Sequence, residues 1–252
     1  MNLDQFEFTI IDLFTKELLE EHEGDYGFVC TSNNSVSRVG YCTNLTLETI
    51  EQAIKNKVDL MITHHDAWGF MHGLRDDCVE KLQENNISHF FIHGPLDFVE
   101  FGTCTSLMNI LGIDTIKQYS PYKDGDVPGI GELSNPVSFS LLVNRMRDEL
   151  NEPVRAWKHN QKDIKRVGVL TGAGNSTDHI RQALHSGCDT YITGEASLYT
   201  IQYAQYVGIN LLVGSHTFTE IYGVESLVKR IKEIHTELEL IQLHEPHFEL
   251  NH

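Results

Sequence analysis

Short apolar runs alternate with amphipathic segments along most of the chain, a pattern typical of parallel strands joined by helices. The segment 47–56 has one apolar stripe at helical spacing, formed by Leu47, Ile50, Ala53 and Ile54. The segment 60–63 is apolar at consecutive positions, as expected of a strand whose sheet is covered on both faces. Alternation at this spacing predicts right-handed βαβ crossovers in a largely parallel sheet.

Two segments of the chain repeat one another. Residues 50–63 (IEQAIKNKVDLMIT) and 180–193 (IRQALHSGCDTYIT) align without gaps and are identical at six of fourteen positions, whereas average composition gives roughly one match by chance. The similarity extends upstream, where Arg38-Val-Gly resembles Arg166-Val-Gly, and downstream, where residues 87–92 resemble 209–213. Two copies are too few for a solenoid and imply two similar halves.

Each half is expected to run strand, helix, strand, helix, strand. The expected elements are 36–42, 47–56, 60–63, 79–85 and 90–92 in the first half, and 167–171, 177–186, 190–193, 198–206 and 211–213 in the second. Residues 3–21 are expected to form one helix. The Pro/Gly/Asp-rich stretch 119–131 indicates a boundary. We therefore expect an α/β protein with halves 1–120 and 121–252, a pseudo-repeat that can also be counted as one domain. The sheets are expected to be mainly parallel, flanked by helices, and the halves intimately packed.

Composition narrows the function classes. The 252 residues include 19 basic and 36 acidic side chains, a formal net charge of −17. This charge serves solubility and argues against nucleic-acid binding. No stretch approaches the roughly 20 apolar residues of a membrane span, and no signal peptide is evident, so we expect no membrane partner. The scattered cysteines contain no C-x-x-C pair and indicate a reduced, cytoplasmic setting, with the thiols as core residues rather than metal ligands or nucleophiles.

Polar side chains follow three of the expected strands. His64 and His65 end the run that begins at Val58, Asp97 comes just after the run 87–92, and His216 and Glu220 stand four apart after 211–213. Ligands of open α/β sheets gather at such strand ends. Three imidazoles and two carboxylates are more donors than one tetrahedral ion takes from protein. The set indicates two neighbouring metal ions, an arrangement that activates water for hydrolysis.

Each of these residues also has a plain structural interpretation. Paired histidines are often hydrogen-bonded core residues, a His-x-x-x-Glu spacing is common by chance, and an aspartate in a loop usually caps or turns the chain. Adjacent strand residues point to opposite faces, so His64 and His65 share a site only if the strand ends before them. The duplication favours the metal interpretation, because pseudosymmetric strand ends give the five residues a reason to meet.

Six stretches resemble a known family, the dinuclear-metal, hexameric proteins often called GTP cyclohydrolase 1 type 2 homologues, or the NIF-three-like family. The matching stretches are DLMITHHDAWGF, HGPLDFVEFGTCTSLMNILGI, PGIGELSNPVSF, KRVGVLTGAGNS, GCDTYITGE and GSHTFTEIYGVESL. They occur in family order from about residue 36 to residue 230, nearly the whole chain. The paired histidines with the downstream HTFTE are specific to the family, whereas the glycine-rich GAGNS is not.

The resemblance implies a ligand set and an assembly. The implied metal ligands are His64, His65, Asp97, His216 and Glu220, with Glu220 bridging both ions. The implied assembly is a toroidal homohexamer with metal sites facing an internal cavity. It also implies the short architecture, without the insertion that some members carry between the halves.

Four positions depart from the family pattern. Asp66 follows the paired histidines where proline is common, and Gly94-Pro95 replaces a polar pair after His93. Ala196-Ser-Leu-Tyr199 follows Glu195 where many members carry histidines, and Gly24-Asp-Tyr-Gly27 replaces an N-terminal signature that contains tryptophan. None of these changes removes an implied ligand. They make proton shuttles and substrate contacts of relatives unsafe to transfer.

Two residues are catalytic candidates. Glu195 is a candidate general base, because it occupies the strand end equivalent to His65; its alternative role is a cap or a hydrogen bond to a ligand. His93 is a candidate proton donor to a leaving group, and its alternative role is to orient the Asp97 loop. Gly172-Ala-Gly174 before a helix is a weak candidate phosphate cradle. The histidine-containing C-terminal stretch 244–252 suits either a metal-binding tail or a short final strand with a frayed end.

Two function classes follow. The first is a hydrolase with two divalent ions per subunit, zinc, iron or manganese, which acts on a nucleotide or another nitrogen heterocycle; GTP ring opening is the version that the resemblance implies. The second is a non-enzymatic metal-binding regulatory hexamer. Excess ligands favour the first, because they leave coordination positions for water. The absence of a strong substrate motif favours the second.

Overall fold

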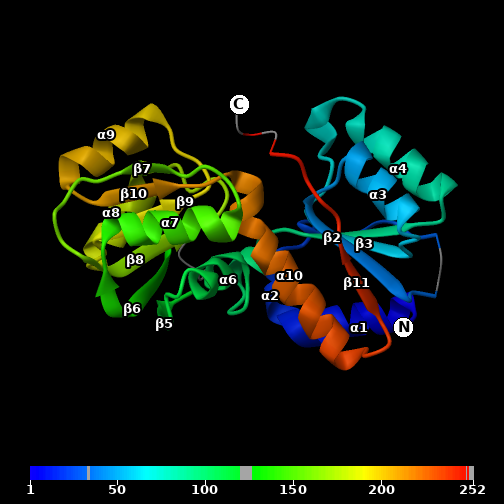
Figure 1. Cartoon of the computed structure of the whole chain (residues 1–252). Helices are drawn as coiled ribbons and strands as arrows, with labels where there is room; N and C mark the ends of the chain where they lie inside the picture. The colour runs from blue at the N-terminus through cyan, green and yellow to red at the C-terminus, as the bar shows by residue number, and fades with distance from the viewer. Residues whose placement is uncertain (33–34, 120–126, 248, 250–252) are drawn as a thin grey trace. The chain divides into compact units, whose positions relative to one another are not determined.

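The computed structural model describes residues 1–32, 35–119, 127–247 and 249. The expected boundary between residues 120 and 121 lies outside the described residues. By internal contacts the chain divides into unit 1, Met1–Asp97 with Val224–Pro246, and unit 2, Phe98–Gly223 with His247–His252. Helices α5 (Gly94–Phe98) and α10 (His216–Ile234) each contain residues of both units. Figure 1 shows the chain with its elements labelled.

Unit 1 is a five-stranded sheet with the order β1-β4-β3-β2-β11. Its strands are β1 (Tyr26–Cys30), β2 (Arg38–Asn44), β3 (Leu60–His65), β4 (Ser88–Ile92) and β11 (Glu239–Gln242). All neighbours are parallel except β1, which is antiparallel to β4. Its helices are α1 (Leu3–Phe14), α2 (Lys16–Glu21), α3 (Leu47–Lys55) and α4 (Leu74–Glu84), with a 3-10 turn at Gly69–Met71. Figure 1 shows α3 and α4 on one side of this sheet and α1 on the other.

Unit 2 is a six-stranded sheet with the order β5-β6-β8-β9-β10-β7. Its strands are β5 (Thr115–Gln118), β6 (Gly129–Val137), β7 (Arg155–Trp157), β8 (Ile164–Leu170), β9 (Thr190–Thr193) and β10 (Asn210–Val213). Its further helices are α6 (Thr103–Ile110), α7 (Phe139–Leu150), α8 (Thr177–His185) and α9 (Leu198–Val207). The three central strands β8, β9 and β10 are parallel, and the flanking strands are antiparallel. The predicted α/β fold of two helix-flanked sheets is confirmed, with a parallel core in each half.

The duplication is visible in the hydrogen bonding. Val39 of β2 lies opposite Leu60 of β3, and the equivalent Val167 of β8 lies opposite Thr190 of β9. The aspartate before the second strand has the same role in both halves. The Asp59 carboxylate accepts from the backbone N–H groups of residues 37 and 38, and the Asp189 carboxylate accepts from those of residues 165 and 166. The two segments therefore share register and turn chemistry as well as sequence.

The cores follow the alternation of strand side chains. In unit 2, Tyr191 and Leu211 pack with α8 and α9, whereas their neighbours Ile192 and Leu212 pack with α6 and α7. In unit 1, Met61 packs against α3 and α4, and Phe6 of α1 lies edge to face with an aromatic ring of β4. Burial of apolar side chains on both faces explains the continuous apolar runs of the central strands. All five cysteines are buried and free, as predicted, at Cys30, Cys42, Cys78, Cys104 and Cys188.

Four features of the expected structure differ from the observed one. The single N-terminal helix is instead two, because Thr15 adopts a positive φ of 62° and caps α2 through its hydroxyl. Helix α4 begins at Leu74 rather than at residue 79. Asp97 lies in the short helix α5 rather than in a loop. The last strand among the described residues, β11, ends at Gln242, before the C-terminal histidine-containing stretch.

Within the described residues, no helix is both long and apolar enough to span a membrane.

The start of helix α3 is marked by a local sequence signal. Thr46 and Thr49 form a reciprocal capping box, with a threonine in the place of the usual acidic residue.

Candidate metal centre

Strand β3 brings two imidazoles to the carboxyl end of the unit 1 sheet. The expectation that this strand stops before the histidines is wrong, because His65 still pairs with Asn44 of β2. The two rings turn toward different neighbouring strands. His64 Nδ1 lies 2.9 Å from the carbonyl oxygen of Ile92 at the end of β4. His65 Nδ1 lies 2.8 Å from Asn44 Oδ1. The ring centroids are nevertheless 4.6 Å apart, so both rings reach one site over the edge of the sheet.

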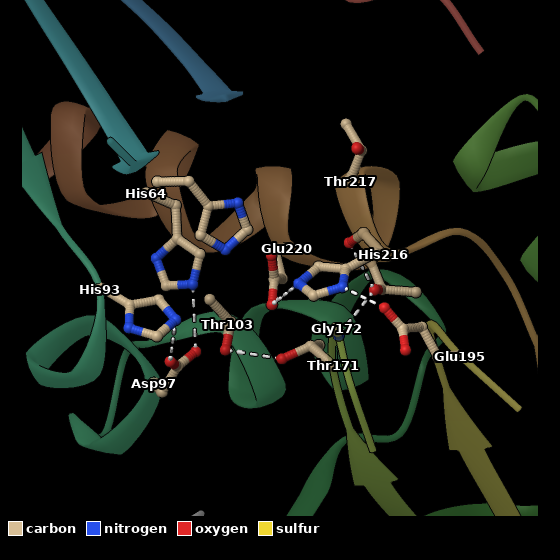
Figure 2. Close-up of polar contacts among 12 residues, drawn as sticks. His64, His93, Asp97, Thr103, Thr171, Gly172, Glu195, His216, Thr217 and Glu220 are labelled. Atoms are coloured by element: carbon tan, nitrogen blue, oxygen red, sulfur yellow. Dashed lines mark hydrogen bonds and ion pairs between the residues drawn. The ribbon is translucent and has the colours of Figure 1, made fainter. Parts of the chain in front are cut away.

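The segment after β4 adds a third imidazole and a carboxylate. His64 Nε2 lies 3.4 Å from Asp97 Oδ1, and His93 Nε2 lies 4.0 Å from Asp97 Oδ2. Figure 2 shows both rings directed at the Asp97 carboxylate. The ligand nitrogens of His64, His65 and His93 lie within 4.8 Å of one another. Unit 1 therefore gathers four donors at one sheet edge.

The hydrogen bonds of the three rings define which nitrogen is available. A backbone carbonyl and a carboxylate only accept hydrogen bonds, so the partners Ile92 O and Asp25 require protonated Nδ1 atoms on His64 and His93. The amide of Asn44 is oriented by Glu245, which accepts from Asn44 Nδ2 at 2.8 Å and leaves Oδ1 for His65. In each ring the lone pair then lies on Nε2, as a metal ligand requires.

Glu245 belongs to the C-terminal stretch whose role the sequence left open. Besides the Asn44 side chain, its carboxylate accepts from the backbone N–H groups of Thr43 at 2.7 Å and Asn44 at 2.9 Å. Burial raises the pKa of Glu245, and the three hydrogen bonds counter this effect. The residue is 201 positions from Asn44, so no local sequence signal could have identified the contact.

In unit 2 the donors lie at the start of α10. His216 is its first residue and Glu220 follows one turn later, with His216 Nε2 3.3 Å from Glu220 Oε1. On the other side of the ring, His216 Nδ1 lies 2.7 Å from Glu195 Oε1. Figure 2 shows His216 held between the two carboxylates. Burial lowers the pKa of His216, but Glu220 and Glu195 outweigh it and raise the pKa to about 10. The prediction that His216 and Glu220 share a helix face is confirmed.

Glu195 is itself positioned by the loop after β8. Asn175 Nδ2 donates to Glu195 Oε2 at 2.7 Å, which leaves Oε1 for His216. This geometry matches the alternative that the sequence left open, a carboxylate that hydrogen-bonds to a ligand imidazole. The loop after β8 therefore positions Glu195 through Asn175.

Two glycines make room for the helix that carries the unit 2 donors. Gly172 has a φ of 60°, and a Cβ there would lie 2.0 Å from Glu220 Oε1 and 2.8 Å from His216 Nε2. A Cβ on Gly194 would lie 2.8 Å from the Cα of His216. Both glycines are thus required by close approach, not by general flexibility.

Carboxylates also hold the N-terminus of α10. Glu152 Oε1 accepts from the backbone N–H of Ser215 at 2.7 Å, and Glu249 accepts from those of His216 at 2.7 Å and Thr217 at 2.9 Å. Anionic groups stabilise the positive end of a helix dipole. The sequence does not predict these contacts, because their partners are 32 to 63 positions apart.

Asp66, the first departure from the family pattern, has both oxygens committed elsewhere. Arg75 Nε donates to Oδ2 at 2.7 Å and the backbone N–H of Ala67 donates to Oδ1 at 2.8 Å. The side chain therefore fixes the turn after β3 rather than a ligand imidazole. Trp68, three residues after His65, packs edge to face on Phe91 and His93. Phe70 is 74% exposed.

The donors of each unit fit divalent ions. Unit 1 offers Nε2 lone pairs and a carboxylate, and unit 2 offers an imidazole Nε2 beside a buried carboxylate. Imidazole and carboxylate ligands together suit zinc, iron and manganese. Each imidazole also has the outer hydrogen bond that ligand histidines usually make.

The chain is similar in sequence and in fold to known proteins. A curated relative from Pyrococcus abyssi, named GTP cyclohydrolase 1 type 2 homolog, is 27% identical over 213 residues, 82% of this chain and 84% of its own. One of the same name from Haemophilus influenzae is 26% identical over 227 residues, 85% of this chain and 88% of its own. The solved structure of the hypothetical protein SA1388 from Staphylococcus aureus has the same fold, with a TM-score of 0.83 at 16% identity, covering 100% of this chain and 99% of that one. The family model described as Duf34/NIF3 (NGG1p interacting factor 3) matches residues 1–246. The chain therefore belongs to the Duf34/NIF3 family.

Proposed function

We propose that the protein is a metal-dependent hydrolase that binds two divalent ions per subunit and acts on a nucleotide or another nitrogen heterocycle. The proposed ligands are His64, His65, Asp97, His216 and Glu220, with Glu220 shared by both ions. The observation that carries the proposal is the hydrogen bonding of the imidazoles: Nδ1 of each ligand histidine lies on an oxygen, so Nε2 is the nitrogen that a metal ion would bind. The family relationship supports the same ligand set.

The chain's own residues define how such a centre works. When bound, divalent ions lower the pKa of water and polarise a carbonyl or phosphoryl oxygen of the substrate. Glu195 holds His216 in the Nε2-donating orientation; we propose this as its main role, with proton acceptance from water as a second. His93 lies in hydrogen-bonding contact with Asp25 and turns Nε2 toward Asp97.

The substrate class rests on the names of relatives. Curated relatives carry the name GTP cyclohydrolase 1 type 2 homolog, which makes GTP the first substrate to test. A net charge of −17 disfavours polymeric nucleic acid. We further propose that the protein is a homohexamer. We also propose a cytoplasmic location, because five buried cysteines without disulfides suit a reducing compartment.

A second function, a non-enzymatic metal-binding regulatory assembly, is favoured by one surface. Helix α9, which follows Glu195, carries no charged residue, and its exposed side chains include Leu198 (64%), Tyr199 (72%) and Tyr206 (85%). An exposed apolar helix face is typical of a protein–protein contact. This surface replaces the histidines that many members carry after the glutamate.

One experiment separates the two functions. Metal-reconstituted protein is assayed for GTP consumption and against panels of nucleotides and cyclic amides, beside the variants His65→Ala and His185→Ala. His185 is exposed, lies on α8 and is not among the proposed ligands. A hydrolase consumes one of these substrates, loses that activity in His65→Ala and keeps it in His185→Ala. Absence of turnover across the panels at full metal occupancy would favour the regulatory assembly.

A further inference from the structure

His93 is held by an aspartate from the N-terminal part of unit 1. Asp25 Oδ1 lies 3.0 Å from His93 Nδ1, and Asp25 Oδ2 accepts from the backbone N–H of Gly94 at 2.9 Å. The backbone N–H of His93 in turn donates to the carbonyl oxygen of Asp25 at 3.0 Å. Asp25 thus binds both the side chain and the backbone of the segment that follows β4.

The close contact depends on a glycine. A Cβ on Gly94 would lie 2.3 Å from His22 Nδ1 and 2.4 Å from Asp25 Oδ2. No side chain fits at this position without displacing the aspartate. Two departures from the family pattern, Asp25 within Gly24-Asp-Tyr-Gly27 and Gly94 after His93, are therefore parts of one packing arrangement.

We propose that Asp25 is a positioning residue that makes His93 a third imidazole ligand, beside His64 and His65, for a divalent ion. The inference rests on the proposed function, because it extends the ligand set of that centre. A carboxylate accepts the Nδ1 proton, which places the lone pair on Nε2 and increases the basicity of the ring as a ligand. The ligand nitrogens of the three histidines lie within 4.8 Å of one another, and all belong to unit 1.

This role differs from both roles that the sequence suggested for His93. A proton donor to a leaving group needs a proton on Nε2, the atom directed at Asp97. A histidine with a purely structural role does not require an unprotonated Nε2 close to the nitrogens of two other imidazoles. The three rings share one pattern, with an oxygen acceptor on each Nδ1: Ile92 O, Asn44 Oδ1 and Asp25.

The variant Asp25→Asn tests the positioning role. Asp25 Oδ1 accepts from His93 Nδ1 at 3.0 Å, and Oδ2 accepts from the Gly94 N–H at 2.9 Å with a longer contact of 3.2 Å to His93 Nδ1. An amide has a single acceptor oxygen, so its NH₂ group must face one of these two partners. If it faces His93, the ring takes the opposite tautomer and Nε2 carries the proton. If it faces Gly94, two donors oppose each other and the loop moves.

The experiment titrates metal-free full-length protein with Co²⁺, recording the affinity and the visible absorption bands of the bound ion. We expect Asp25→Asn to weaken binding about 10- to 100-fold, the range for loss of an outer hydrogen bond. We expect His93→Gln to weaken it at least as much, and both variants to shift the bands. The matched control is Glu23→Gln, which removes the same charge from an exposed neighbour and should change neither. Thermal unfolding of metal-free variants checks that each one folds.

The double variant distinguishes positioning from general structure. If Asp25 acts through His93, adding Asp25→Asn to His93→Gln produces no further loss of affinity. An additive further loss would overturn the positioning role, as would wild-type affinity and unchanged bands in Asp25→Asn. Wild-type protein that takes up no Co²⁺ would instead overturn the proposed function. If wild-type protein binds Co²⁺ and His93→Gln binds it with the same affinity, this inference alone would be overturned.

Discussion

The two halves share one frame and differ in the side chains at their strand ends. By the alignment of the repeat, His64 and His65 of β3 correspond to Gly194 and Glu195 after β9. The frame around them is shared, from the register of the central strands to the aspartates that bind the preceding backbone. Unit 1 is rich in imidazole and unit 2 in carboxylate. The repeat thus fixes where donors stand, while one or two residues at each strand end decide their chemistry.

The halves also differ in how they support their donors. In unit 1 each imidazole needs an oxygen acceptor, supplied from distant positions by Asn44, Ile92 and Asp25. In unit 2, helix α10 approaches the backbone closely at Gly172 and Gly194, and a side chain at either position would clash with it. Imidazoles must be oriented, because only one nitrogen can ligate in each tautomer. A carboxylate has two acceptor oxygens with several lone pairs, so it depends less on a single orientation. Its main requirement is that no neighbouring side chain occupies its position.

The largest expected effect comes from filling that space. Gly172→Ala places a methyl group 2.0 Å from Glu220 Oε1, at a φ of 60°. Both the clash and the strain displace Glu220, so we expect metal binding to fall by more than 100-fold, beyond the usual effect of an outer hydrogen bond. Gly187→Ala is the matched control, because its φ is 80° but its nearest neighbour lies at 4.0 Å. That variant should lose about 1 kcal/mol of stability from strain and bind metal normally. Equal metal binding by the two variants would contradict the close-approach argument.

Acid sensitivity is expected to come from unit 1. His89 on β4 occupies the register position that Leu211 has on β10. Burial lowers the pKa of His89 to about 3. In an unfolded chain the pKa is about 6.5, so the unfolded state binds the proton first as the pH falls. The contribution of His89 to stability is complete above about pH 6.5 and is lost toward about pH 3.

Urea unfolding measures this prediction. At roughly 1.4 kcal/mol per unit of pKa difference, wild-type protein should lose a few kcal/mol across the whole window. His89→Leu, which introduces the residue of the other half, should be less stable at neutral pH but should depend less on pH between about pH 7 and about pH 5. His185→Gln, at an exposed site, serves as the control. An unchanged pH dependence in His89→Leu would show that His89 is not the acid-sensitive group.

A smaller effect is expected from the carboxylate that orients His216. Glu195→Gln keeps the size of the side chain but offers one acceptor oxygen to two donors, His216 Nδ1 and Asn175 Nδ2. We expect metal affinity to fall about 10-fold, the low end for loss of an outer hydrogen bond. Glu239→Gln, on the exposed edge of β11, is the control. If Glu195 serves only as a general base, affinity stays unchanged and only turnover falls.

The smallest effect is expected at Glu245. Glu245→Gln disturbs the orientation of the Asn44 amide, one bond further from His65 than Glu195 is from His216. We expect a loss of metal affinity of about threefold, below the range for directly bonded partners. Competition titration against a chelator resolves this difference. A loss as large as that of Glu195→Gln would mean that the Asn44 amide is less well held than its contacts indicate.

The sequence predicts the central strands and helices of both halves, because hydrophobic periodicity and the repeat can be recognised in short segments. Residues 47–63 and 177–193 were predicted almost to the residue, since burial on both faces and capping threonines or serines define their ends. The break at Thr15 was missed, because a threonine at positive φ has no sequence signature. The antiparallel strands β5 and β6 were also missed, since their pairing depends on distant partners.

The candidate site was predictable only in part. Strand ends and helical spacing pointed to His64, His65, His216 and Glu220 as donors. The side chains that orient these donors, Asn44, Asp25 and Glu245, come from segments remote in sequence. Their roles depend on three-dimensional contacts that no local pattern encodes. Asp66 shows the reverse case, a residue next to the donors that serves the turn.

The most direct test of the central claim is the metal content of the purified protein, measured by mass spectrometry after dialysis against metal-free buffer. We expect two divalent ions per chain in the wild type and a clear reduction in both His65→Ala and Glu220→Gln. Wild-type protein that retains no divalent ion, or variants that retain as much as the wild type, would contradict it.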